Sequence, residues 1–136
     1  MAVGDVDEVV GLYVDVFSRP PWDEPWTTDD ARRCLGPMLA APGAVGVVAH
    51  DDGVLVGMAL GAIERQAGHD VFLLREMCVR AARQRSGVGR ALLDALEQRL
   101  DVESWYLLTA RESPAAAFYE SSGFRRAGRM AVWVRP

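Results

Sequence analysis

A short, basic, glycine-containing segment stands between an apolar stretch and an amphipathic stretch, and reads Gln84-Arg85-Ser86-Gly87-Val88-Gly89-Arg90. Before it, Val71 to Val79 predicts a strand, and after it Arg90 to Leu100 predicts a helix with leucines on one face. Such a turn presents backbone N–H groups at a helix N-terminus, where the helix dipole favours negative charge. Gly87 and Gly89 let the backbone approach a ligand closely. The segment is therefore predicted to bind phosphate.

The glycine spacing of this segment excludes two common phosphate-binding motifs. A dinucleotide-binding turn requires GxGxxG, whereas the second glycine here is followed by Arg90-Ala91-Leu92. A Walker loop requires lysine, and the chain has none, because all 15 of its basic residues are arginine. The absence of lysine also excludes catalysis through a lysine Schiff base.

Glu76 is the second feature that could do chemistry, because it interrupts the apolar strand predicted at Val71 to Val79. Burying a carboxylate is unfavourable unless the group is paired or used. Since side chains alternate along a strand, Arg75 and Glu76 are expected on opposite faces and should not pair with each other. Two roles stay open, an ion pair with another arginine and a general base. Burial raises the pKa of a carboxyl group, which would suit the removal of a proton from an amine.

The rest of the pattern predicts the elements that position these residues. Helices are expected from Asp5 to about Phe17, from Thr27 or Thr28 to about Leu39, and from Pro114 to Ser122 after a cap at Ser113. Strands are expected over 44–50, 54–63, 71–79 and 103–109, with a hairpin turn at 51–53, a polar loop over 64–70 and a last strand or hairpin over 124–134. This order predicts a single α/β (α+β) domain over residues 1–136, with three layers and a mixed sheet.

Composition narrows the classes of partner. The chain has 136 residues, a formal net charge of −4 and a pI near 5.1, which disfavours nucleic acid. No stretch approaches the ~20 apolar residues of a membrane span, and no signal peptide is recognised at the N-terminus. Cys34 and Cys78 have no metal-ligand spacing, so no metal is expected. Both are interpreted as buried thiols of a cytoplasmic protein.

Together with a second motif downstream, the predicted phosphate-binding segment resembles a known protein family. QxxGxG at Gln84 to Gly89, followed by an apolar helix, resembles the pyrophosphate turn of the GNAT superfamily of acyl-CoA-dependent N-acyltransferases. Residues Ser113 to Phe124 resemble that family's NxxAxxFYxxxGF segment. The resemblance covers nearly the whole chain and implies a GNAT-like fold, a mixed, mostly antiparallel sheet flanked by about four helices. The family's first strand would be short or missing, because only Met1 to Gly4 precede the first helix.

The resemblance implies acetyl-CoA as the donor and direct transfer within a ternary complex. The glycine-containing segment would hold the CoA pyrophosphate, and the end of the strand before it would hold the pantetheine amides as an added strand would. The residues implied in donor binding are Met77, Cys78, Val79, Gln84, Arg85, Ser86, Gly87, Val88, Gly89, Arg90, Ser113 and Ala116. Arg83, Arg85 and Arg90 either add charge near the phosphates or are solvated surface residues. Ser113 departs from the family's usual asparagine, and Arg85 departs from its usual glycine.

The resemblance also implies roles for two side chains. Glu76 matches the family's general base, and Tyr119 matches the general acid that serves the leaving thiolate of CoA. A phenol with a pKa of about 10 can protonate or hydrogen-bond a thiolate whose thiol has a pKa of about 8.5. The alternative for Tyr119 is packing against Phe118.

The acceptor is expected to be a small cationic amine, held by acidic and aromatic residues in the loop between the first two helices. These residues are Trp22, Asp23, Glu24 and Trp26. The tryptophans have a second interpretation, which is packing of the loop onto the domain. A protein N-acetyltransferase and a non-catalytic, acyl-CoA-binding regulatory domain remain as alternatives, and the acyl chain stays open. An exposed sheet edge at the N-terminus favours a homodimer.

Overall fold

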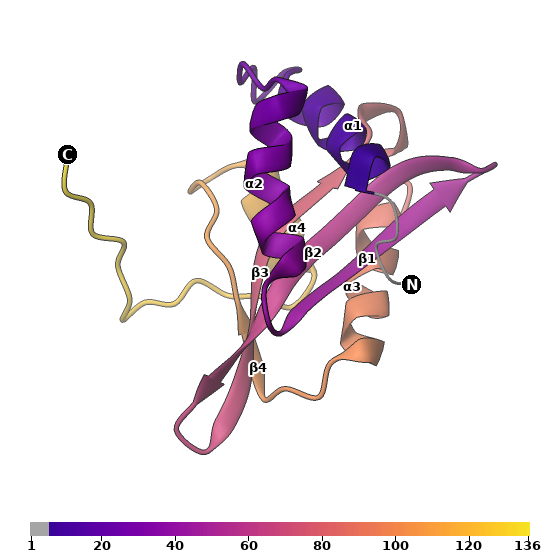
Figure 1. Ribbon diagram of the computed structural model, residues 1–136. Helices are drawn as coiled ribbons and strands as arrows, with labels where there is room; N and C mark the ends of the chain where they lie inside the picture. Colours follow the sequence, from indigo (N-terminus) through magenta and orange to yellow (C-terminus); the bar gives the residue numbers. More distant parts are fainter. Residues whose placement is uncertain (1–5) are drawn as a thin grey trace.

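A computed structural model describes residues 6–136 of the chain (Figure 1). Its elements, in order, are α1 (Val6–Phe17), α2 (Thr28–Ala40), β1 (Ala44–Asp51), β2 (Val54–Gln66), β3 (His69–Val79), the 3-10 helix η1 (Ala81–Arg83), α3 (Val88–Arg99), β4 (Ser104–Tyr106) and α4 (Pro114–Ser121). The expected start of the first helix at Asp5 and the question of a strand at Met1 to Gly4 fall outside the described residues.

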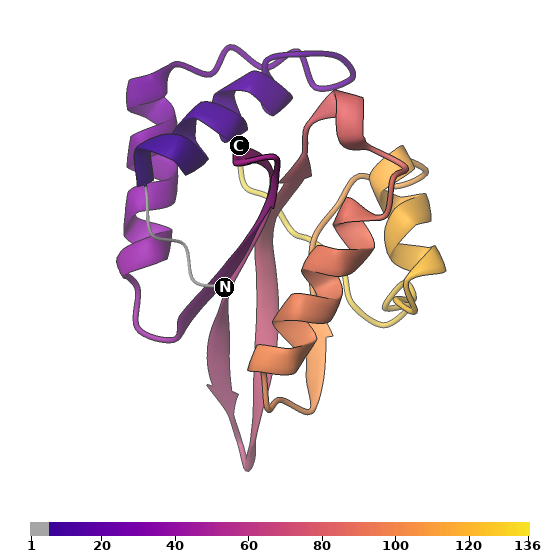
Figure 2. The same cartoon turned by 90° about the vertical axis from the view of Figure 1, so that its right-hand side faces the viewer.

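The four strands form one mixed sheet in the order β1-β2-β3-β4. β1, β2 and β3 pair antiparallel, and β4 joins β3 in parallel. Helices α1 and α2 lie on one face of the sheet, and α3 and α4 lie on the other (Figure 2). The predicted three-layer α+β fold with a mixed sheet is therefore confirmed. No helix within residues 6–136 is both long enough and apolar enough to cross a membrane.

The apolar stripe of each main helix gives the sheet two hydrophobic cores. The core beneath α1 and α2 contains Val9, Val10, Leu12, Tyr13, Val16, Phe17, Ala31, Leu35, Leu55, Met58, Leu60 and Cys78. The core beneath α3 contains Val47, Ala59, Phe72, Leu74, Leu92, Leu93 and Leu96. Neither core contains a charged side chain in the described part of the chain.

Two helices begin at residues that the sequence marks as caps. The Thr27 side chain accepts a hydrogen bond from the backbone N–H of Asp30 at 3.1 Å. Ser113 does the same for α4, accepting from the N–H of Ala116 at 3.0 Å, and Pro114 stands in the first turn. These bonds satisfy N–H groups that the helices leave unpaired.

The hairpin between β2 and β3 is longer than predicted. The strands continue to Gln66 and from His69, so the polar loop expected over 64–70 is wrong and a two-residue turn replaces it. Arg65 and Asp70 face each other in this extension and form an ion pair at 3.0 Å. Polar side chains on an exposed hairpin can therefore continue the strand pairing, because opposite charges on facing residues attract each other across the two strands.

Two further strand predictions are wrong. β4 covers only Ser104–Tyr106 rather than residues 103–109, because β3 and β4 stop pairing there. Residues 124–134 form no strand, although their composition suits one. Met130 and Trp133 are 76% and 90% exposed, and the chain end runs away from the sheet (Figure 1). A strand needs a partner edge, and the segment meets none within residues 6–136.

A β-bulge in β3 lies directly beside Glu76. Leu60 of β2 pairs with Glu76, whereas the next residue, Gly61, pairs with Leu74. Arg75 is therefore an extra residue on β3. A bulge of this kind bends a strand and changes the phase of its side-chain alternation.

The phase change removes the strict alternation on which the expected placement of Arg75 and Glu76 depended. Leu74 and Met77 both pack into the core beneath α3, although they are three positions apart. No ion pair joins Arg75 and Glu76 within residues 6–136, although the positive charge of Arg75 lowers the pKa of Glu76.

Candidate active site

β3 and β4 separate at the end of the sheet that leads to the predicted phosphate-binding segment. They pair only between Val71–Leu73 and Ser104–Tyr106, while β3 continues to Val79. Within residues 6–136, no strand pairs with this side of β3 beyond Leu73. The side of β3 at Met77–Val79, where an added strand was predicted to bind, therefore has no strand partner among the described residues.

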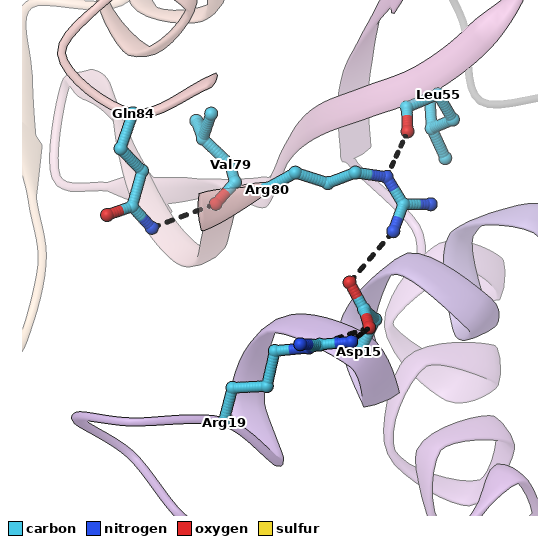
Figure 3. Close-up of polar contacts among 6 residues, drawn as sticks. All are labelled: Asp15, Arg19, Leu55, Val79, Arg80 and Gln84. Carbon is cyan, nitrogen blue, oxygen red and sulfur yellow. Dashed lines mark hydrogen bonds and ion pairs between the residues drawn. The ribbon is translucent and has the colours of Figure 1, made fainter. Parts of the chain in front are cut away.

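Arg80 fixes the chain where β3 ends (Figure 3). Its backbone N–H donates to the carbonyl of Val56 at 2.8 Å, and its Nε donates to the carbonyl of Leu55 at 2.9 Å. Its Nη1 donates to Oδ2 of Asp15 on α1 at 2.9 Å. The start of the segment is thus tied to both β2 and α1. No local signal marks Arg80 for this role, because its partners lie far away in the sequence.

The polar side chains that open the segment bind the protein itself. Nε2 of Gln84 donates to the carbonyl of Val79 at 3.0 Å (Figure 3). Arg83 forms an ion pair with Asp51 at the end of β1, and the hydroxyl of Ser86 donates to the carbonyl of Arg83. These contacts give the loop its shape, and the backbone N–H groups of Arg83 and Gln84 add to them by donating to the carbonyls of Arg80 and Ala81.

The N-terminus of α3 has unpaired backbone donors beside open space. Gly87 is the N-cap, with φ of 90°, and no side chain caps the helix. The first backbone bond of the helix runs from the N–H of Ala91 to the carbonyl of Gly87, so the N–H groups of residues 88–90 have no acceptor within the helix. A Cβ placed on Gly87 would meet no atom within 4 Å. The predicted site therefore offers both donors and space.

Gly89 has a packing role that the sequence does not reveal. A Cβ there would lie 3.0 and 3.1 Å from two ring atoms of Phe118 on α4, and 3.5 Å from Cε of Met77. The missing side chain thus lets α4 lie close to α3. Because Tyr119 follows Phe118, this contact also helps to place the predicted general acid.

The hydroxyl of Ser113 is used on both sides by the protein. It accepts from the N–H of Ala116 at 3.0 Å and donates to the carbonyl of Ala110 at 2.8 Å. These bonds complete the N-terminus of α4, and the contact of Ser113 and Ala116 with the donor stays a prediction.

Glu76 projects from β3 towards α1. Its Oε1 accepts a hydrogen bond from the hydroxyl of Tyr13 at 3.2 Å. Burial raises the pKa of Glu76, and neither the Tyr13 bond nor the charge of Arg75, which both lower it, cancels that effect. No arginine forms an ion pair with Glu76 in residues 6–136, so the interpretation as a structural ion pair has no support.

Tyr119 takes the packing role considered for it, and its hydroxyl is protonated at neutral pH. Its ring packs against Phe118 and Phe124, with centroid separations of 5.3 and 5.5 Å. Burial, followed by the negative charge of Glu76, raises the pKa of Tyr119 to about 12. The two predicted catalytic side chains are therefore close enough to interact electrostatically, although they come from different layers. The phenol keeps its proton at neutral pH, as a hydrogen-bond donor to a thiolate must.

A cavity of about 540 Å³ opens beside α2. Its lining residues are Glu24, Pro25, Trp26, Asp30, Arg33 and Cys34. Trp26 sits edge-on to Tyr13 at 4.9 Å between ring centroids, and its Nε1 donates to Glu24 at 3.0 Å. The cavity thus adjoins the aromatic ring whose hydroxyl reaches Glu76.

The four residues predicted to hold the acceptor divide into two groups. Glu24 and Trp26 line the cavity, whereas Trp22 and Asp23 do not. Trp22 packs against Phe17 of α1 with ring centroids 5.3 Å apart, which is the packing role considered for the tryptophans. Trp26 takes both roles, because it also packs against the core beneath α1.

The cysteines offer no alternative chemistry. Burial raises the pKa of the Cys78 thiol to about 12, so it is protonated and a poor nucleophile at neutral pH. Burial also raises the pKa of Cys34. The described residues contain no cluster of three or more His, Cys, Asp or Glu side chains able to hold a metal ion.

Comparison with solved structures shows the same fold. A candidate acetyltransferase from Agrobacterium tumefaciens str. C58 is 30% identical, with a TM-score of 0.77 and coverage of 100% of this chain and 98% of that chain. The aminoglycoside N-acetyltransferase AAC(6')-Iy, solved with CoA, is 18% identical, with a TM-score of 0.73 and coverage of 96% and 88%. The aminoglycoside acetyltransferase meta-AAC0020 from an uncultured soil metagenomic sample, solved with sisomicin, is 18% identical, with a TM-score of 0.69 and coverage of 95% and 85%.

Comparison by sequence gives the family. Among curated proteins, no relative matches this chain. The family model described as "Acetyltransferase (GNAT) domain" matches residues 42–126, which include the phosphate-binding segment, Glu76 and Tyr119. This match covers more than half of the chain. The similarity to the Agrobacterium structure covers all of it. The chain therefore belongs to the GNAT family of acetyltransferases, acyltransferases that use acetyl-CoA.

Proposed function

We propose that this acetyltransferase transfers an acetyl group from acetyl-CoA to the primary amine of a small cationic molecule, by direct attack in a ternary complex. The observation that carries the proposal is Glu76, a half-buried carboxylate of raised pKa that has no ion-pair partner within residues 6–136. Such a group is suited to accept a proton near neutral pH.

The donor would be held by backbone rather than by side chains. The N–H groups of residues 88–90 and the open turn at Gly87 would bind the pyrophosphate, since the helix dipole adds to their attraction. The free side of β3 at Met77–Val79 would pair with the pantetheine amides. Arg85, which has no partner among the described side chains and has φ of 64°, would add positive charge beside the turn.

The reaction then needs three proton transfers. Glu76 takes a proton from the acceptor ammonium, and the neutral amine attacks the thioester carbonyl. A C–N bond forms and the C–S bond breaks, so that CoA leaves as a thiolate. Tyr119 gives that thiolate its proton, and the nitrogen loses its second proton as it becomes an amide, which reprotonates Tyr119 through solvent. Glu76 releases the first proton to solvent. Much of the rate would come from holding the amine and thioester together.

The acceptor class is supported by the charge of the cavity beside α2. Glu24 and Asp30 contribute two carboxylates and Trp26 an aromatic face, against the one guanidinium of Arg33, which is paired with Asp29. This combination favours a cation. Two structures of the same fold, AAC(6')-Iy and meta-AAC0020, are aminoglycoside acetyltransferases, which act on polycationic small molecules. We therefore place the amine of a small cationic acceptor between this cavity and Glu76.

Calorimetry and a thiol-release assay test this proposal. Acetyl-CoA should bind, and a panel of aminoglycosides, polyamines and peptides with free N-termini should show thiol release with a small cationic member. Glu76→Gln should bind acetyl-CoA with unchanged affinity and lose turnover. Turnover of peptides alone would favour a protein N-acetyltransferase. Tight acetyl-CoA binding without release on any amine would favour a non-catalytic regulatory domain.

We also propose that the protein is a homodimer, on a different ground from the N-terminal edge considered above. The support is the C-terminal tail, defined as residues 129–136, whose large apolar side chains are 67–90% exposed at Met130, Val132, Trp133 and Val134. Such a patch is typical of an interaction surface. Sizing chromatography should show a dimer for the full chain and a monomer after removal of the tail. A monomeric full chain would contradict the proposal.

A further inference from the structure

The position of the Glu76 carboxylate depends on a residue of another layer. The hydroxyl of Tyr13 on α1 donates to Oε1 of Glu76 at 3.2 Å, across 63 positions of sequence. Within residues 6–136 it is the only side-chain hydrogen bond that Glu76 receives. We propose that Tyr13 is a positioning residue for Glu76, holding one carboxylate oxygen so that the other is free to take the proton of the acceptor amine. This inference rests on the proposed function, in which Glu76 is the base.

Packing fixes the Tyr13 hydroxyl in place. The residue is only 4% exposed and belongs to the buried stripe of α1. Its ring lies 4.6 Å from that of Phe17 and 4.9 Å from that of Trp26, between centroids. Neighbouring rings on two sides leave it little freedom to rotate away. A donor held this firmly can orient its acceptor.

The direction of the hydrogen bond follows from the protonation of the phenol. Burial, and then the negative charge of Glu76, raise the pKa of Tyr13 above its ordinary value. The phenol therefore keeps its proton and acts as the donor. A donated hydrogen bond favours the charged carboxylate and lowers the pKa of Glu76, in opposition to burial. Tyr13 thus increases the fraction of Glu76 that is able to accept a proton.

Other titratable or charged groups act on Glu76 or respond to it from each element packed around it. They are Arg75 and Cys78 on β3, Glu24 in the loop before α2, Cys34 on α2 and Tyr119 on α4. The two charged ones oppose each other, because Arg75 lowers the pKa of Glu76 and Glu24 raises it. The other three have pKa values raised by burial and stay neutral. Removal of the Tyr13 hydroxyl therefore removes its hydrogen bonds to Glu76 and to the neutral Cys34 side chain without changing any charge.

The Tyr13→Phe variant tests the inference, with carboxyl ¹³C NMR of the full-length protein as the readout. The Glu76 resonance is assigned by its loss in Glu76→Gln, and its titration needs neither acceptor nor acetyl-CoA. A hydrogen bond to a charged group corresponds to about one pH unit or more, so the midpoint should rise by that amount. Phe17→Leu, which changes the same aromatic cluster without removing a hydroxyl, should leave the midpoint unchanged.

Kinetics give the second readout, with acetyl-CoA and the panel amine that shows the fastest thiol release. In Tyr13→Phe, the midpoint of the acidic limb of the kcat–pH profile should move to higher pH by the same amount. The KM for acetyl-CoA should stay the same. A midpoint that does not rise in folded Tyr13→Phe overturns the inference, even where Glu76→Gln has lost turnover. If Glu76→Gln has the same kcat–pH profile as the wild type, Glu76 is not the base, and the inference fails with that assignment.

A third measurement does not depend on the folding of Tyr13→Phe. In the wild-type protein, the ¹³Cζ resonance of Tyr13 should follow the protonation of Glu76 and show the same midpoint. In Glu76→Gln that step should vanish. A Tyr13 resonance that is insensitive to pH over the Glu76 titration would overturn the hydrogen bond on which the inference depends.

Discussion

Replacing Gly89 by valine tests whether glycine is needed at this position for the packing of α4 on α3 or for the binding of acetyl-CoA. The Cβ alone would stand 3.0 and 3.1 Å from ring atoms of Phe118, and valine adds two methyl groups beyond it. Overpacking of a well-packed contact costs about 1–3 kcal/mol. Valine has a better helix propensity than glycine, but this offsets only about 0.3–0.5 kcal/mol of that cost. We expect Gly89→Val to lower the free energy of unfolding by about 1–3 kcal/mol.

Thermal unfolding measures this effect. At about 3–4 °C per kcal/mol for a chain of this length, the Tm should fall by roughly 3–12 °C. Gly11→Val is the matched control, because Gly11 is also helical and a Cβ there meets nothing within 4 Å. That variant should keep its Tm within about 2 °C, since it creates no contact.

A double-mutant cycle identifies the ring as the cause. Phe118→Leu removes the ring atoms that the valine would meet, so the pair should be coupled by about 1 kcal/mol or more. Because Tyr119 is the neighbour of Phe118, kcat should fall more than the affinity for acetyl-CoA does. The reasoning is refuted if Gly89→Val abolishes acetyl-CoA binding at unchanged Tm and Phe118→Leu restores nothing. Gly89 would then serve close approach of the donor.

Three further substitutions address the donor site and the proton transfers. Glu76→Gln should be more stable than wild type, by a margin that grows as the pH rises above about 4.3. The reason is that the pKa of Glu76 is raised in the folded state, so the wild type loses stability as this carboxyl group deprotonates. Urea unfolding across pH measures the margin, and a constant or reversed margin contradicts the reasoning. Tyr119→Phe should lower kcat by ~10²-fold with unchanged acetyl-CoA affinity in steady-state kinetics, and a near-wild-type rate would exclude it as the acid. Gly87→Ala should weaken acetyl-CoA binding in calorimetry, because it fills the open turn and strains a residue at φ of 90°; unchanged affinity would move the pyrophosphate elsewhere.

Local signals in the sequence predicted the helices, most of the strands and the strand–loop–helix unit around Gln84 to Gly89. Thr27 and Ser113 mark helix starts because a cap involves residues only three positions apart. The spacing from Gln84 to Gly89 identifies the turn for the same reason, since strand, loop and helix follow one another directly. The fold follows from the order of these units, and a family resemblance adds the pairing of Glu76 with Tyr119.

Contacts between distant residues escaped prediction. Tyr13 appears in the sequence only as one apolar position of a helix stripe, and its bond to Glu76 spans 63 positions. Arg80 meets Asp15 across 65 positions and has no motif of its own. The bulge at Arg75 depends on the register of two strands, which alternation within one strand does not specify. Residues 124–134 have the composition of a strand, but composition does not say whether an edge is available.

The exposed tail gives the protein an intrinsic optical reporter. Of its 4 tryptophans, Trp22, Trp26 and Trp105 each pack edge-on against another aromatic ring. Trp133 has no ring contact within residues 6–136 and is 90% exposed. Its emission should be solvent-shifted and open to an aqueous quencher as long as the tail is uncovered. Titration of protein concentration against iodide quenching, with Trp133→Phe as the blank, would then follow burial of the tail in solution without any label.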